Sequence, residues 1–206
     1  MRLTFNTFVM KTLLSHIQFD KLIIVVILLG SINGYGQVID DISLIDVKSG
    51  QEMKVTNGDN PVVSIFFCNS CPYSSYYLNR IKNLSNKFKE VKFILVNSSP
   101  DTFNDKESVD QMKNYVSENG LTIPYLADKN QELFKALGAS KCPEAFLLVK
   151  SGSQLKVAYH GAIDDNPQVE GQERSKYLEE AILSVLAGRE IPDQSVRPQG
   201  CVIKKI

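Results

Sequence analysis

The sequence predicts an α/β domain in which helices flank a central mixed sheet. Residues 62–67 form an apolar run with a single serine, which is typical of a strand buried on both faces. Apolar residues at helical spacing follow, and residues 91–96 form a second apolar run. This order favours two parallel strands joined by a right-handed crossover. Further runs at 146–149 and 155–160 meet at Gly152 and predict an antiparallel hairpin that closes the sheet.

The remaining elements are shorter. Alternating runs at 42–47 and 52–55 flank Gly50, and this pattern predicts an N-terminal β-hairpin. Three further segments have helical patterns and end near a glycine, and one short segment between the first two is extended. The helices are expected at 105–119, 130–137 and about 173–186, and the extended piece at 123–126.

The first 36 residues have a different character from the rest of the chain. The uninterrupted apolar run 22–29 follows scattered basic residues and precedes small residues, which is the layout of a secretory signal. The run is shorter than the ~20 residues that a membrane span needs, but an uncleaved anchor stays open as an alternative. We expect a signal peptide or N-terminal anchor over 1–36, a domain over 38–188 and a tail over 189–206.

This layout predicts an exported protein, in the periplasm of a bacterium, where disulfides persist. A membrane contact is expected only if the N-terminal segment is not cleaved. The 206 residues include 23 basic and 23 acidic side chains and no basic patch, so nucleic acid is not an expected partner.

A Cys-x-x-Cys motif, Cys68 to Cys71, follows the central strand. We expect both cysteines on the first turn of the next helix, where Pro72 fits because its missing N–H has no intrahelical acceptor. A helix N-terminus carries partial positive charge, which stabilises a thiolate. Cys68 is therefore the predicted nucleophile, and Cys71 is the predicted resolving thiol, which attacks the mixed disulfide formed at Cys68.

Two alternative interpretations of this motif are a purely structural disulfide and one half of a zinc site with four thiolate ligands. Such a zinc site needs a second pair of cysteines, but the two other cysteines, Cys142 and Cys201, are isolated in the sequence. The strand-to-helix context favours a redox dithiol.

Four stretches of the chain, together with Pro143 at the start of a later strand, resemble a known family. They are 67–73, 124–128, 161–167 and 197–204. On these residues the chain from about 40 to 206 is similar to thioredoxin-like redoxins of the alkyl hydroperoxide reductase and thiol-specific antioxidant superfamily.

The resemblance implies a thioredoxin fold with a cis-proline at Pro143, opposite the dithiol. The backbone before it would pair with the extended chain of a partner protein. The residues expected to contact this partner are Pro143, Cys142, Phe67, Pro72 and Tyr73. A dithiol of this kind needs no organic cofactor.

The chain departs from the thioredoxin pattern in several places. Phe67 replaces the usual Trp before the first cysteine, and the central strand lacks an acidic residue. Glu144 or Asp128 could replace that acid, but we expect both on solvated surfaces. His160 is expected at the surface or in packing, and residues 164–167 in a turn with carboxylates that bind their own backbone.

Cys142 immediately precedes Pro143, so the implied fold places a third sulfur near Cys68. Three interpretations remain open: a small packing residue, a redox partner of Cys68 or of Cys201, or a third thiolate for a soft ion such as Cu(I). A structural or redox bridge between Cys142 and Cys201 would tie the tail to the domain.

We therefore expect an exported thiol–disulfide oxidoreductase that exchanges disulfides with protein thiols. Another dithiol protein, acting as reductant or oxidant, returns it to its starting redox state. One rival is a peroxiredoxin-like peroxidase, in which Cys68 becomes a sulfenic acid and Cys71 condenses with it. Pro61 has the spacing of the peroxidase motif, but Ile65 stands where that motif has Thr. A second rival is a copper-handling module that uses Cys68, Cys71 and Cys142.

Overall fold

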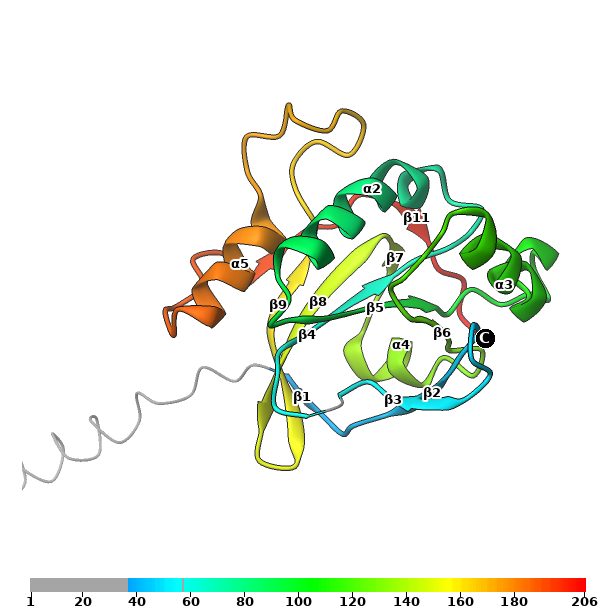
Figure 1. Ribbon diagram of the computed structural model, residues 1–206, viewed down its shortest axis with the longest axis horizontal. Helices are drawn as coiled ribbons and strands as arrows, with labels where there is room; N and C mark the ends of the chain where they lie inside the picture. The colour runs from blue at the N-terminus through cyan, green and yellow to red at the C-terminus, as the bar shows by residue number, and fades with distance from the viewer. Residues whose placement is uncertain (1–36, 57) are drawn as a thin grey trace, which may run out of the picture. The chain divides into compact units, whose positions relative to one another are not determined.

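The computed structural model describes residues 37–56 and 58–206 (Figure 1). The expected leader over 1–36 lies outside these residues. The described strands are β1 (Val38–Ile39), β2 (Ser43–Asp46), β3 (Glu52–Lys54), β4 (Val62–Phe66), β5 (Lys92–Asn97), β6 (Tyr125–Ala127), β7 (Lys141–Cys142), β8 (Glu144–Ser151), β9 (Gln154–Gly161), β10 (Ser195–Val196) and β11 (Cys201–Val202). The helices are α2 (Pro72–Lys87), the 3-10 turn η1 (Asp105–Glu107), α3 (Val109–Glu118), α4 (Glu132–Leu137) and α5 (Tyr177–Leu186).

The main sheet of the described chain has the strand order β1-β9-β8-β4-β5-β6-β2-β3. The predicted parallel pair is confirmed as β4 and β5, and the predicted hairpins are confirmed as β2–β3 and β8–β9. The second hairpin does not close the sheet, however, because β1 and β10 both pair with the outer edge of β9. Each of these strands has two residues, which is too short for a recognisable alternation in sequence.

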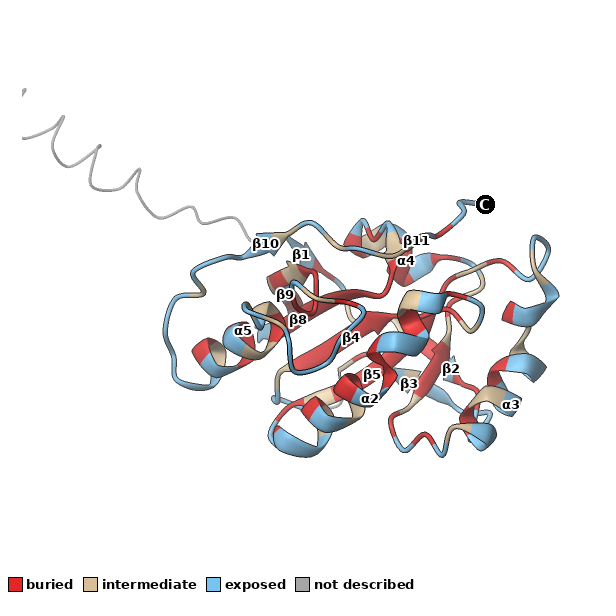
Figure 2. Ribbon diagram, turned by 90° about the horizontal axis from the view of Figure 1, so that it is seen from above, coloured by how far each residue is buried: buried red, intermediate tan, exposed pale blue. Residues whose placement is uncertain are grey.

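The central strand β4 is buried along its whole length because helices cover both faces of the sheet (Figure 2). Val63 and Ile65 belong to the apolar cluster that includes residues of α2, α3 and α5. Val62 and Phe66 belong to a second cluster that includes residues of α4. This alternation explains why the sequence of β4 is apolar at almost every position.

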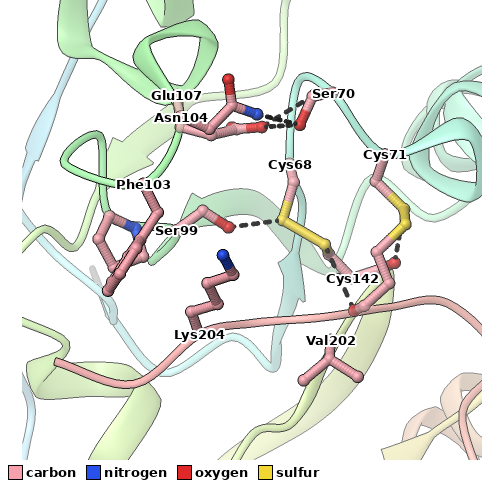
Figure 3. A pocket seen from close by; sticks show the side chains of 12 residues that line it. Cys68, Ser70, Cys71, Ser99, Phe103, Asn104, Glu107, Cys142, Val202 and Lys204 are labelled. Atoms are coloured by element: carbon pink, nitrogen blue, oxygen red, sulfur yellow. Dashed lines mark hydrogen bonds between the residues drawn. A yellow bond between two sulfur atoms is a disulfide. The ribbon is translucent and has the colours of Figure 1, made fainter.

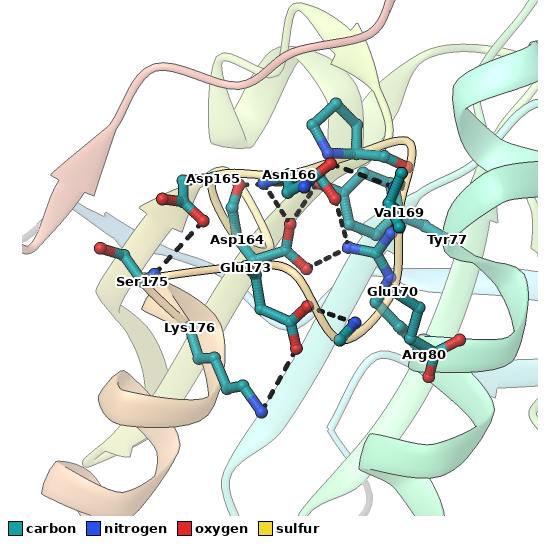
Figure 4. A network of polar contacts seen from close by, with 12 residues as sticks. Tyr77, Arg80, Asp164, Asp165, Asn166, Val169, Glu170, Glu173, Ser175 and Lys176 are labelled. Carbon is teal, nitrogen blue, oxygen red and sulfur yellow. Dashed lines mark hydrogen bonds and ion pairs between the residues drawn. The ribbon is translucent and has the colours of Figure 1, made fainter.

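A buried ion pair fixes the segment that follows β9. Arg80 of α2 pairs with Asp164, whose carboxylate also accepts a hydrogen bond of 2.8 Å from the hydroxyl of Tyr77 (Figure 4). The Arg80 guanidinium donates as well to the carbonyl oxygens of Asn166 and Pro167, at 2.7 and 3.1 Å. The expected turn at 164–167 is confirmed, since Asp164 accepts from the Asn166 N–H, but Asp164 is buried.

The C-terminal residues return to the domain at two places. Residues 195–196 pair with β9, and β11 pairs with β7 to form a separate two-stranded sheet. Within residues 37–56 and 58–206, no helix has the length and apolar character needed to cross a membrane.

Candidate functional site

The Cys-x-x-Cys motif lies in the turn between β4 and α2. The helix begins at Pro72, four residues after Cys68. The expectation that both cysteines lie on its first turn is therefore wrong. Cys71 is the N-cap, with φ −84° and ψ 119°. A residue before proline is disfavoured in the α conformation, which explains why the helix starts after Cys71. The Cys71 N–H donates to the Cys68 carbonyl oxygen at 3.3 Å and closes the turn.

All four cysteines meet beside this turn, in two disulfides (Figure 3). Cys68 is bonded to Cys142 and Cys71 is bonded to Cys201, and the Cα atoms of each pair are 6.0 Å apart. Pairing with Cys68 is one of the interpretations that the sequence leaves open for Cys142. The structure does not join Cys142 to Cys201, although the two residues face each other across the β7–β11 ladder.

The implied cis-proline is confirmed, because the Cys142–Pro143 peptide bond is cis. This places the Cys142 backbone next to the motif, with its carbonyl oxygen 3.1 Å from the Cys71 Sγ. A disulfide sulfur carries no hydrogen, so this is a contact in the oxidised form. Once Cys71 is reduced, its thiol can donate to the same oxygen.

A cavity of about 250 Å³ adjoins the four sulfurs. Besides the cysteines, it is lined by side chains from the loops after β4 and β5 and from the tail: Ser70, Ser99, Pro100, Phe103, Asn104, Glu107, Val202 and Lys204. The Ser99 hydroxyl lies 3.0 Å from the Cys68 Sγ and is the donor in this contact, since that sulfur has no hydrogen. Lys204 extends from the tail toward Ser99 in Figure 3, with its Nζ 4.7 Å from the centre of the Phe103 ring.

Glu107 holds the turn that carries the motif. Its carboxylate is buried and accepts hydrogen bonds from the N–H groups of Asn69 and Ser70, at 3.0 and 2.9 Å. It also accepts from the Ser70 hydroxyl and from the Asn97 side-chain amide. The sequence places Glu107 inside an expected helix, and nothing in that pattern indicates its role.

Lys129 supports the loop after β5. Its ammonium group donates to the carbonyl oxygens of Ser99 and Glu107 and to the side-chain oxygen of Asn97. Burial lowers the pKa of Lys129 from its ordinary value, and nearby carboxylates oppose this shift. Burial also raises the pKa of Tyr125, whose hydroxyl donates to the Asn69 side chain at 2.9 Å. These contacts give the turn and the adjoining loop one shared support.

The residues expected to contact a partner are not equivalent in the structure. Phe67 is fully buried between Tyr115 and Tyr125, so the expectation that its side chain contacts a substrate is wrong. It fills the core beneath the motif. The apolar cluster to which it belongs is on the opposite face of the sheet from the cluster that contains Cys68, Cys71 and Cys142. Pro72 is exposed and Tyr73 is half-buried, and both remain available at the surface.

Two carboxylates expected on solvated surfaces, Asp128 and Glu144, are buried. Asp128 accepts from backbone N–H groups at the start of α4 and from the Ser98 hydroxyl. Glu144 accepts from the N–H groups of Ser140 and Lys141. Both expectations are wrong because local backbone donors satisfy each carboxylate and permit its burial. An Asp two residues before a predicted helix lies near the capping position, and this signal could have indicated the burial of Asp128.

His160 packs on Phe146, with parallel rings whose centres are 5.7 Å apart, and this confirms the packing interpretation. Among the described residues, no group of three or more His, Cys, Asp or Glu side chains is arranged to hold a metal ion. In this disulfide-bonded form the cysteines engage one another, so the copper-handling interpretation gains no support.

Solved structures with the same fold are known from several bacteria. An uncharacterised conserved protein of Geobacillus kaustophilus is 28% identical, with a TM-score of 0.74 over 83% of this chain and 92% of that one. A hypothetical protein of Sinorhizobium meliloti is 24% identical, with a TM-score of 0.73 over 83% and 94% of the two chains. A secreted disulfide oxidoreductase of Mycobacterium tuberculosis is 13% identical, with a TM-score of 0.51 over 70% and 96%. Among the curated proteins, none matches the sequence of this chain.

The mixed sheet flanked by helices is thus a thioredoxin fold, as the sequence resemblance implies. The family model for redoxins matches residues 36–178, which is most of the chain and includes β4, the Cys-x-x-Cys turn and cis-Pro143. Because this model matches more than half of the chain, the protein belongs to the Redoxin family.

Proposed function

We propose that the protein is an exported thiol–disulfide oxidoreductase that exchanges disulfides with partner proteins through Cys68 and Cys71. The observation that carries this proposal is the meeting of both motif sulfurs with two further cysteines at one cavity. Disulfide exchange requires a second sulfur within bonding reach of the one that reacts, and here each motif cysteine has one.

The reaction begins when protein dithiols reduce the two bridges. Each bridge takes up two electrons and two protons, and one protein dithiol is oxidised to a disulfide for each bridge reduced. The Cys68 thiolate then attacks a disulfide of the partner protein, forms a mixed disulfide and releases one partner thiolate. A second thiol of this chain attacks the Cys68 sulfur, releases the other partner thiolate and leaves a new internal disulfide. The same steps in reverse oxidise a partner dithiol.

Two thiols are candidates for the resolving step. Cys71 is the candidate from the motif, since it lies three residues after Cys68. Cys142 is the second candidate, because it is the residue that bonds Cys68 in the structure. The Ser99 hydroxyl, 3.0 Å from the Cys68 sulfur, can donate to a thiolate there and stabilise it.

A peroxidase gains less support. Ile65 occupies the Thr position of the peroxidase motif and is fully buried in β4. It brings no hydroxyl to the cavity, so a peroxide oxygen would lack the donor that this motif supplies.

Insulin reduction with dithiothreitol as the electron source tests the proposal. We expect wild type to accelerate insulin precipitation and Cys68→Ser to abolish the acceleration. The two further variants are Cys71→Ser and Cys142→Ser. Whichever of them lacks the resolving thiol should accumulate a mixed disulfide with insulin chains, which mass spectrometry detects. Unchanged activity of Cys68→Ser would exclude this mechanism, and hydrogen peroxide consumption without insulin reduction would favour the peroxidase.

A further inference from the structure

The C-terminal tail lies along the strand that precedes the cis-proline. In the β7–β11 ladder Cys201 is the partner of Cys142 and Val202 the partner of Lys141. The Ile203 N–H extends the contact by donating to the Ser140 carbonyl oxygen at 3.0 Å. The edge expected to hold a partner's extended chain therefore already holds one, and the cysteine of that chain is bonded to the motif.

The residue before the docked cysteine lies against the backbone of β7. A Cβ atom on Gly200 would collide with the carbonyl group of Cys142. The atoms in the way belong to the backbone of a short strand and not to the flexible end of a side chain, so they cannot move without distorting β7. Only glycine fits at this position of the docked chain.

The two residues after the docked cysteine differ in their surroundings. Val202 is 72% exposed, whereas Ile203 is 3% exposed and belongs to the apolar cluster that contains Leu133 and Leu137 of α4. The edge of β7 thus selects an aliphatic side chain two positions after the cysteine and accepts any side chain between them.

The backbone beyond Ile203 is held by one side chain. Gln131 is fully buried, and its amide donates to the Lys204 carbonyl oxygen at 2.6 Å and accepts from the Ile206 N–H at 3.1 Å. The amide is itself oriented by a hydrogen bond to the Ser98 carbonyl oxygen at 2.9 Å. These bonds recognise main chain, so they hold an extended chain of any sequence.

We propose that the edge of β7 is a docking surface for partner chains of the form Gly-Cys-x-aliphatic, and that the tail is its internal occupant. This proposal rests on the proposed function and names its substrate class. A partner must displace the tail, which is tethered at high effective concentration. Reduction of the Cys71–Cys201 bond by a protein dithiol yields two thiols and the oxidised dithiol, and it removes the covalent hold on the tail.

Activated peptides test the proposal with reduced, full-length Cys201→Ser protein. The parent peptide has the sequence of residues 199–204, Gln-Gly-Cys-Val-Ile-Lys, with its cysteine as a 2-thiopyridyl disulfide. A protein thiolate attacks the peptide sulfur, forms the protein–peptide disulfide and releases 2-thiopyridone, whose absorbance gives the rate. Three variant peptides replace Gly by Ala, Val by Ser or Ile by Ser, and 2,2′-dithiodipyridine measures thiol reactivity without docking.

We expect Ala for Gly and Ser for Ile to slow the reaction about tenfold or more, and Ser for Val to change it less than about twofold. Equal rates for all four peptides would overturn the proposal. If equal rates accompany normal insulin reduction, only the docking proposal fails. If the ranking holds while Cys68→Ser still reduces insulin, only the proposed function fails.

The tail itself supplies a second test. Gly200→Ala should loosen residues 201–203 in the reduced protein, so their amide hydrogens exchange faster and the parent peptide reacts several-fold faster. Gln199→Ala is the matched control, because Gln199 is the exposed neighbour of Gly200. Identical exchange rates for the two variants would show that Gly200 does not limit docking and would overturn the steric argument.

Discussion

The carboxylate of Glu107 accepts a 2.9 Å hydrogen bond from the backbone N–H of Ser70, inside the Cys-x-x-Cys turn and 37 residues away in sequence. Glu107 is buried, and the adjoining N–H of Asn69 donates to the same carboxylate. The geometry of the motif therefore depends on a side chain from the 3-10 turn η1 as well as on the start of α2.

The first prediction concerns this support. Glu107→Ala should lower the free energy of unfolding by roughly 2–4 kcal/mol, because two backbone N–H groups of the turn and the buried Asn97 amide lose a charged acceptor. Disulfide exchange should slow in the same variant, since the turn loses its fixed shape. Urea denaturation measures the first effect and insulin reduction the second. Asp105→Ala, an exposed change in the same turn, should alter stability by less than about 0.5 kcal/mol; equal losses in both variants would contradict the assigned role of Glu107.

The second prediction concerns the disulfide pairing. Proteolysis of the oxidised protein without reduction, followed by mass spectrometry, should yield peptides linked through Cys68–Cys142 and Cys71–Cys201. A dominant peptide with an internal disulfide between Cys68 and Cys71 would contradict this pairing. Cys201→Ser should lower the free energy of unfolding by roughly 2–4 kcal/mol under oxidising conditions, because the bridge closes a long loop. The difference from wild type should vanish in dithiothreitol.

The third prediction concerns the buried ion pair. Arg80→Met should destabilise the protein by about 3–5 kcal/mol, because it leaves the Asp164 carboxylate buried without its cation. Lys87→Met removes an ion pair with Glu179 whose lysine side chain is 54% exposed, and it should cost less than about 1 kcal/mol. Denaturant midpoints compare the two variants. Similar losses would indicate that Arg80 contributes mainly through its packing.

The fourth prediction concerns pH. Burial raises the pKa of Asp128 above its ordinary 3.8, and its hydrogen bonds to Ser98 and to α4 only partly oppose the shift. The folded protein therefore holds this proton to a higher pH than the unfolded chain does. Relative to Asp128→Asn, the stability of wild type should be greatest below pH 3.8 and should decline as pH rises through the raised pKa, then stay constant.

Urea unfolding of wild type and Asp128→Asn, at intervals from about pH 3 to about pH 7, checks this difference. Asparagine keeps one side-chain oxygen that can accept from the N–H groups at the start of α4, so it removes the titration while it retains part of this hydrogen bonding. A stability difference that is constant across this range would mean that the Asp128 carboxyl has the same pKa in both states.

The sequence by itself was enough to predict the sheet's centre and the helix that follows it. The apolar run of β4 has this character because both faces of the strand are covered, and the helical repeat of α2 reflects its single buried face. The Cys-x-x-Cys turn and Pro72 are local features, so their place between strand and helix could be predicted as well. The cis form of Pro143 followed from the family resemblance.

Only the tertiary structure decided which sulfurs bond and which acidic residues support them. Cys68 and Cys142 are 74 residues apart, and Cys71 and Cys201 are 130 apart. Their pairing depends on the path of the tail along β7, and β11 is too short to leave a pattern in sequence. The burial of Glu107 likewise depends on donors contributed by a distant turn, because a carboxylate can leave water only where such donors replace it.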